Sequence, residues 1–131
     1  MGTSTVTVPE GATRLIVNLE NATAPDFDLY VGKGTTPSAA TLVASSASGG
    51  SAESIDLGLA EGDEGPWWIL VQNWEASASG TDTVDLETAV VAGAEGNMTA
   101  EGPETNPFNE PFTITTTWDE PAMEPGQSWY G

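Results

Sequence analysis

Asp26 and Asp28 are a pair of residues whose types and spacing could do chemistry. They flank Phe27 in a segment that alternates apolar and polar residues, so an extended strand would point both carboxylates to the same side. Paired carboxylate oxygens suit calcium, which takes six to eight oxygen ligands. Two carboxylates do not complete such a shell, and the further ligands would have to come from Glu20, Asn21 or Asp56. The alternative is that Asp28 caps a turn by accepting backbone N–H bonds.

A tryptophan-rich segment, residues 67–74, is the second candidate site. Strand alternation assigns Trp67, Ile69 and Val71 to the core and turns Trp68, Leu70 and Trp74 outward. The two outward indoles would lie roughly 20 Å apart along the strand.

Exposed aromatic side chains on a flat sheet can stack on sugar rings or lie along a polypeptide. We expect a ligand-binding surface made of Trp68, Leu70 and Trp74, joined by Tyr30 if the strand of Tyr30 pairs with the tryptophan strand. The alternative is that a neighbouring loop, or a strand at residues 112–118, covers this face.

The amino-acid composition argues against an enzyme. The chain has no histidine, no cysteine and a single lysine, Lys33, so the usual activating bases and thiolate nucleophiles are missing. A carboxylate pair could hydrolyse glycosides, but no pair stands in an apolar, aromatic setting that would raise one pKa. We therefore expect no catalytic residues.

The charge balance limits the possible partners. Twenty acidic residues face one arginine and one lysine, a net charge of −18. Nucleic acids and anionic membranes are bound by cationic side chains, so neither is an expected partner. No stretch is apolar for 18 residues, and the start lacks the pattern of a signal peptide. We expect an excised domain of a secreted, extracellular protein, monomeric, in a saline or calcium-rich setting that screens the repulsion.

The elements that must position these residues are strands, because the dominant period is two. Short alternating segments with turn signals between them occupy residues 5–8, 14–19, 26–31, 41–43, 53–57, 67–74 and 83–90, with an eighth candidate at 112–118. They predict an all-β fold: an antiparallel, jelly-roll-like β-sandwich of seven to eight strands. The predicted core consists of Leu15, Val17, Phe27, Leu29, Val31, Ile69, Val71, Val84 and Leu86.

The composition changes near Ala92. Residues 1–92 hold the seven regular strands, whereas residues 93–111 are mostly glycine, proline, glutamate and asparagine, which is typical of a linker. We therefore expect a sandwich domain at 1–92. Residues 93–131 would be a linker followed either by a strand that docks on the sandwich or by the start of a truncated following domain.

The segment Asp26-Phe27-Asp28-Leu29-Tyr30-Val31 resembles the Asp-x-Asp-Leu-Tyr-Val strand of the bacterial pre-peptidase C-terminal domain family. The likeness covers residues 5–91. It includes an opening strand and turn at residues 6–12, a Gly-x-aromatic-aromatic strand starting at Gly65, and a closing strand at residues 81–91. The resemblance implies a β-sandwich appended to a secreted subtilisin-like or other protease.

The resemblance also implies what such a domain does. Distant relatives, the collagen-binding modules of clostridial collagenases, hold insoluble protein with aromatic residues on one sheet face and bind calcium nearby. We expect a non-catalytic accessory domain that holds its enzyme on insoluble protein, the substrate of the parent protease, with polysaccharide as the weaker alternative ligand. The other interpretation is a structural appendage that aids secretion, folding or solubility and is removed during maturation.

Overall fold

The computed structural model describes residues 1–93, 96–128 and 130. The chain divides into two compact units, Met1–Ala92 and Gly93–Gly131. Every regular element among the described residues is a β-strand. No helix in this part of the chain is long and apolar enough to cross a membrane.

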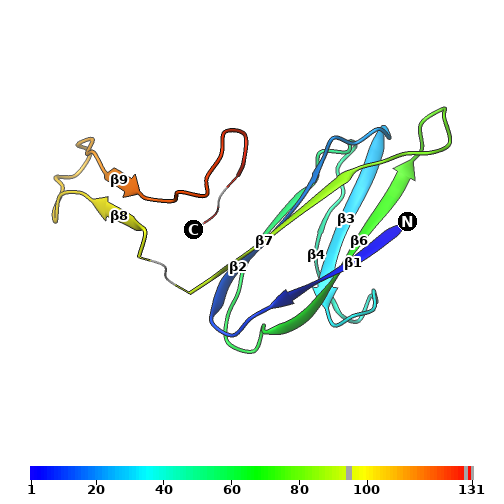
Figure 1. The fold of residues 1–131 in the computed structure, drawn as a ribbon, viewed down its shortest axis with the longest axis horizontal. Coiled ribbons are helices and arrows are strands. Elements are labelled where there is room, and N and C mark those ends of the chain that lie inside the picture. Colours follow the sequence, from blue (N-terminus) through cyan, green and yellow to red (C-terminus); the bar gives the residue numbers. More distant parts are fainter. Residues whose placement is uncertain (94–95, 129, 131) are drawn as a thin grey trace. The chain divides into compact units, whose positions relative to one another are not determined.

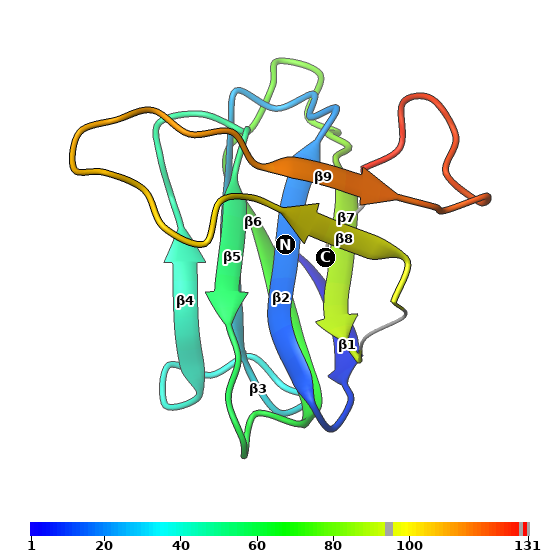
Figure 2. The ribbon, with the colours of Figure 1, turned by 90° about the vertical axis from the view of Figure 1, so that its left-hand side faces the viewer.

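The first unit is a two-layer antiparallel β-sandwich of seven strands (Figure 1). A four-stranded sheet has the order β1-β6-β3-β4, and a three-stranded sheet has the order β5-β2-β7, whose strands lie side by side in Figure 2. The strands are β1 (Gly2–Val8), β2 (Ala12–Glu20), β3 (Asp26–Lys33), β4 (Leu42–Ser46), β5 (Ser54–Gly58), β6 (Gly65–Glu75) and β7 (Asp85–Ala92). The predicted all-β sandwich is confirmed.

The core forms where the apolar side chains of alternating residues from the two sheets meet. Seven of the predicted core residues are buried: Leu15, Val17, Phe27, Leu29, Val31, Ile69 and Val71. Val84 and Leu86 are partly buried and pack against this cluster from β7 and the residue before it. Trp67 is buried with them, as strand alternation predicts.

Strand β6 lies between β1 and β3, so its residues are paired on both sides. Leu70 lies opposite Thr3 of β1 and opposite Tyr30 of β3. Further along, the ladder between β3 and β6 is interrupted between Asp26 and Phe27, where the register shifts. Because directly opposed residues share a sheet face, Tyr30 and Leu70 lie together on the outer face of the four-stranded sheet.

The second unit contains a two-stranded antiparallel ribbon, β8 (Met98–Glu101) with β9 (Thr115–Trp118). The nine strands of the described chain are one more than the upper expectation of eight. The eighth predicted strand, at residues 112–118, corresponds to the shorter β9, while β8 was not predicted. No described residue of this unit is buried.

Candidate functional site

Three of the four residues predicted to bind a ligand have accessible side chains on the β1-β6-β3-β4 sheet. Trp74, near the end of β6, is 67% exposed. Tyr30 and Leu70 are partly exposed and lie directly opposite each other. Trp74 stands about 13 Å beyond Leu70 along the strand, at the bulge where the pairing shifts from Phe27–Asn73 to Asp26–Glu75 and leaves Trp74 without a partner in β3. These three residues are the outer-face cluster.

Trp68 does not belong to the outer-face cluster, and its predicted exposure is wrong. The side chain is only 2% exposed, because its indole lies over Gly32, the residue opposite it in β3. The indole Nε1–H donates a hydrogen bond to Thr41 Oγ1 at 2.9 Å, and Lys33 N–H donates to the Thr41 carbonyl at 3.0 Å. Thr41, at the end of the loop between β3 and β4, therefore covers the indole, in line with the alternative that a neighbouring loop lies over this face.

Asp28 is buried beside Tyr30, although alternation alone pointed it to solvent. The Tyr30 hydroxyl donates a hydrogen bond to Asp28 Oδ2 at 3.1 Å. Burial, and then this bond to the carboxylate, raises the pKa of Tyr30 above its usual range. Asp28 thus anchors the tyrosine ring on the sheet face, a contact that replaces the turn cap considered from the sequence.

Asp26 sits in an environment that disfavours its charge. Its Oδ1 atom is buried and has no hydrogen-bond partner. Burial, and then the charges of Asp28, Glu53 and Glu75, raise its pKa above the ordinary value. Asp26 and Asp28 are near enough to interact, but they differ in that only Asp28 is bonded to a side-chain donor.

Asn73 presents a second buried oxygen without a partner, its amide Oδ1. The amide orientation is fixed, because Nδ2 donates to Asp82 Oδ2 at 3.0 Å. Asn73 lies opposite Phe27, the residue after Asp26. Sequence patterns contain no signal for Asn73, whose partner Asp82 lies in the loop after β6.

Glu53 is a buried acidic residue that the sequence did not single out as a site. It is 2% exposed and accepts hydrogen bonds from the Ser46 hydroxyl and from the backbone N–H and hydroxyl of Ser48. Burial alone would raise its pKa, but these bonds outweigh burial and hold the pKa below its usual value. The signal available was the serine-rich loop at residues 45–51 that immediately precedes this glutamate.

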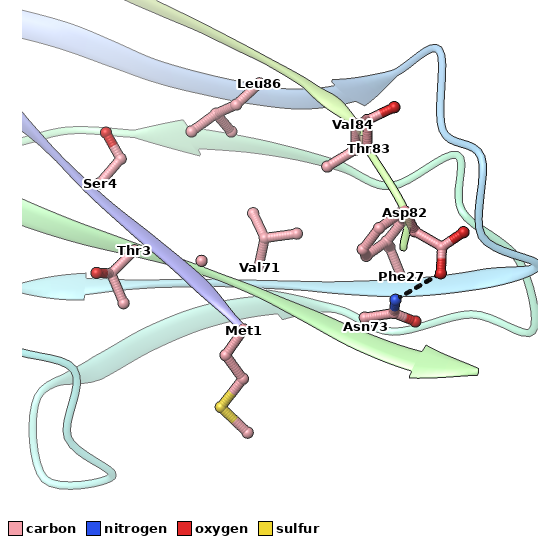
Figure 3. Close-up of a pocket in the computed structure, with 11 residues that line it drawn as sticks. Met1, Thr3, Ser4, Phe27, Val71, Asn73, Asp82, Thr83, Val84 and Leu86 are labelled. Carbon is pink, nitrogen blue, oxygen red and sulfur yellow. Dashed lines mark hydrogen bonds between the residues drawn. The ribbon is translucent and has the colours of Figure 1, made fainter. Parts of the chain in front are cut away.

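A cavity of about 470 Å³ opens between the free edges of the two sheets, next to β1 and β7 (Figure 3). Phe27, Val71 and Leu86 make its lining mainly apolar. Two polar residues of the lining are hydrogen bonded to each other: Asn73 Nδ2 donates to Asp82 Oδ2 (Figure 3). The lining is therefore suited to apolar contact more than to proton transfer.

Among residues 1–93, 96–128 and 130, no group of three or more acidic, histidine or cysteine side chains is close enough to hold a metal ion. A calcium ion near Asp26 would have to draw most of its six to eight ligands from amide oxygens, backbone carbonyls and water. The unpartnered carboxylate oxygen of Asp26 is of the type such an ion takes.

Comparison with known proteins gives one match. The family model described as "Bacterial pre-peptidase C-terminal domain" matches residues 2–94, a segment that contains all seven strands of the sandwich. No curated protein and no solved structure matches the chain.

Proposed function

The chain belongs to the bacterial pre-peptidase C-terminal domain family, and we propose that it is a non-catalytic accessory domain that holds a secreted protease on insoluble protein. The family is one of C-terminal domains of secreted proteases, and the family match covers the whole sandwich. The proposal assigns binding to the outer-face cluster of Tyr30, Leu70 and Trp74. Trp68, whose indole is covered by Thr41, makes no contact with the ligand.

The observation that carries the proposal is the exposure of Trp74. An indole that is 67% exposed on a sheet face offers a large apolar area to a ligand at little cost in side-chain entropy. Tyr30 is held in place on the same face by its bond to Asp28, so one of the two aromatic rings is already oriented. Preorganised aromatic side chains of this kind carry much of the binding energy in protein interfaces.

Retention on insoluble material tests the proposal. The full chain is incubated with collagen, gelatin and keratin, and with chitin and cellulose as polysaccharide surfaces, and the bound fraction is measured after centrifugation. We expect retention on at least one of the proteins and a loss of at least about tenfold in affinity for Trp74→Ala, the effect of removing a hot-spot aromatic. The thermal stability of that variant should match the wild type because the indole is exposed.

Phe108→Ala is the matched control, because Phe108 is also an exposed aromatic side chain, at 93%, but lies outside the sandwich unit. It should leave retention unchanged. Equal loss from both variants would show that exposed aromatic content, and not the outer-face cluster, governs adsorption. No retention of the wild type on any surface would favour the structural appendage, whose net charge of −18 suits a role in solubility.

Calcium at Asp26 is a further part of the proposal. It is supported by the buried, unpartnered Oδ1 atom of Asp26, which a cation would satisfy. The ion would also offset the repulsion between Asp26 and the charges of Asp28, Glu53 and Glu75. In this role calcium stabilises the end of the sandwich that carries Trp74.

A further inference from the structure

The C-terminal ribbon has one apolar and one polar face. Its register pairs Met98 with Trp118 and Ala100 with Thr116, so alternation puts these side chains on one side. Ile114 extends this side beyond the paired strands, since its Cγ1 would lie 3.4 Å from a Cβ added to Gly102. We refer to Met98, Ala100, Ile114 and Trp118 as the apolar ribbon face.

The opposite side of the ribbon is polar and makes its own bonds. The hydroxyls of Thr99 and Thr117 lie 2.6 Å apart in a hydrogen bond across the strands, and Glu101 pairs with Thr115. The two sides therefore differ as the inner and outer faces of a sheet differ in a folded domain.

The apolar ribbon face is open to solvent. Met98 and Ile114 are each 57% exposed and Trp118 is 61% exposed, and Phe112 beside them is 59% exposed. A two-stranded ribbon is at best marginally stable in water by itself. Contiguous apolar side chains left uncovered in this way mark an interaction surface, because covering them stabilises both the ribbon and the complex.

Charge defines what can cover this face. Residues 93–131 contain no lysine or arginine and seven acidic residues: Glu95, Glu101, Glu104, Glu110, Asp119, Glu120 and Glu124. Asp119 and Glu120 directly follow Trp118, where Asn97 Nδ2 donates to Glu120 Oε2 at 3.1 Å. Glu104 lies in the loop that follows β8 at the other end of the ribbon. A surface laid on the apolar face thus meets carboxylates at both ends.

We propose that the apolar ribbon face docks on a partner polypeptide whose surface is apolar in the centre and bordered by lysine and arginine. Cationic borders neutralise the carboxylates at the two ends of the ribbon and fix the register of docking. A second copy of this chain is a poor occupant, because it brings another net charge of −18 to the contact.

The test uses the full chain and a labelled nine-residue peptide with three leucines at alternate positions and two lysines at each end. Fluorescence anisotropy should show binding that weakens by about tenfold between 0.1 M and 1 M sodium chloride. Two matched peptides, one with glutamates in place of the lysines and one with serines in place of the leucines, should not bind. The variant Ile114→Ser with Trp118→Ser should lose binding, whereas Phe108→Ser, at a 93% exposed side chain outside the apolar ribbon face, should keep it.

Several outcomes would overturn the proposal. Binding of the serine peptide as tightly as the leucine peptide would reduce the contact to charge adsorption. Unchanged binding in the Ile114→Ser, Trp118→Ser variant would remove the apolar ribbon face as the site. Self-association of the wild type in sedimentation, lost in that variant, would identify a second copy as the occupant. A lower melting temperature of the sandwich in that variant would mean that the chain itself covers the face.

Discussion

At the scale of single residues, Glu53 shows how this acidic chain buries a carboxylate. Burying a charge costs several kcal/mol unless its oxygens are bonded. Here Oε2 accepts from the Ser46 hydroxyl and Oε1 accepts from both the N–H and the hydroxyl of Ser48. The Glu53 carbonyl in turn accepts from Leu19 N–H of β2 at 2.8 Å. One residue therefore fastens the loop between β4 and β5 to both sheets.

We expect Glu53→Gln to lower the free energy of unfolding by about 1.5–3 kcal/mol at pH 7, because the amide cannot accept all these bonds. The pKa of Glu53 in the folded state lies below the usual 4.5 of a glutamate, so its charged form stabilises the fold above that value. The contribution is lost as the pH falls from there through the folded pKa. Thermal melts should therefore show the difference between the wild type and the variant shrinking as the pH falls below 4.5.

Glu61→Gln, an exposed position on the same unit, is the control and should change stability little at any pH. A difference between wild type and Glu53→Gln that stays constant down to pH 3 would contradict an ionised, bonded Glu53.

The ionised carboxylate of Asp26 affects the stability of the fold in the opposite direction to that of Glu53. Its pKa is raised, by burial first and then by neighbouring carboxylates, so the folded state binds its proton more tightly than the unfolded chain does. The ionised group destabilises the fold fully above the raised pKa, and this cost disappears as the pH falls towards 3.8. Without divalent cations, Asp26→Asn should therefore melt at a higher temperature than the wild type at pH 7.

Bound calcium should instead stabilise the wild type relative to Asp26→Asn, because only the wild type keeps the carboxylate that the proposed site uses. Millimolar calcium should raise the melting temperature of the wild type and leave Asp26→Asn nearly unchanged. Magnesium at the same concentration is the control, because its small octahedral shell is difficult to complete with fixed protein oxygens. Equal shifts with both ions, or with both proteins, would reduce the effect to general screening of charge.

At the scale of elements, the contact between β3 and β6 depends on a missing side chain. A Cβ added at Gly32 would run into the Trp68 ring and the Thr41 carbonyl. Gly32 thus makes room for the indole to lie flat on the sheet, beneath Thr41. This arrangement leaves Trp74, further along β6, as the exposed indole of the strand.

Gly32→Ala should destabilise the sandwich by about 1–3 kcal/mol, the usual cost of overpacking. Gly58→Ala is the matched control, because a Cβ at this strand glycine meets nothing within 4 Å. Urea denaturation should show a lower midpoint for Gly32→Ala and a value within about 0.5 kcal/mol of wild type for Gly58→Ala. Similar midpoints for the two variants would mean that the indole moves aside without cost.

Strand alternation was sufficient to predict the seven strands of the sandwich and most of its core, because each strand has one buried face. It was insufficient for Trp68, since alternation assigns a face but not what covers that face. Nothing in the sequence links Thr41 or Gly32 to that indole. The strand β8 was not predicted from the sequence, because Met98-Thr99-Ala100-Glu101 is short and stands among residues typical of a linker.

At the scale of the whole molecule, unbalanced charge is the main electrostatic feature. Arg14 pairs with Asp56 and Lys33 pairs with Asp63, so both basic residues of the chain engage carboxylates. The other eighteen acidic residues have no basic residue to balance them, which is the net charge of −18. Compaction brings these charges together, so their repulsion destabilises the folded state relative to the unfolded chain.

We therefore expect the melting temperature to rise when sodium chloride increases from 0.1 M to 1 M, because the Debye length falls from about 10 Å to about 3 Å. A variant with Glu10, Glu20 and Glu61 replaced by glutamine removes three exposed charges and should melt higher in 0.1 M salt and respond less to added salt. Its melting temperature should approach that of the wild type at 1 M, where screening has removed most of the repulsion from both proteins. A wild-type melting temperature that is flat or falls over this range would mean that the chain tolerates its charge without cost, and the variant would then show no advantage at low salt.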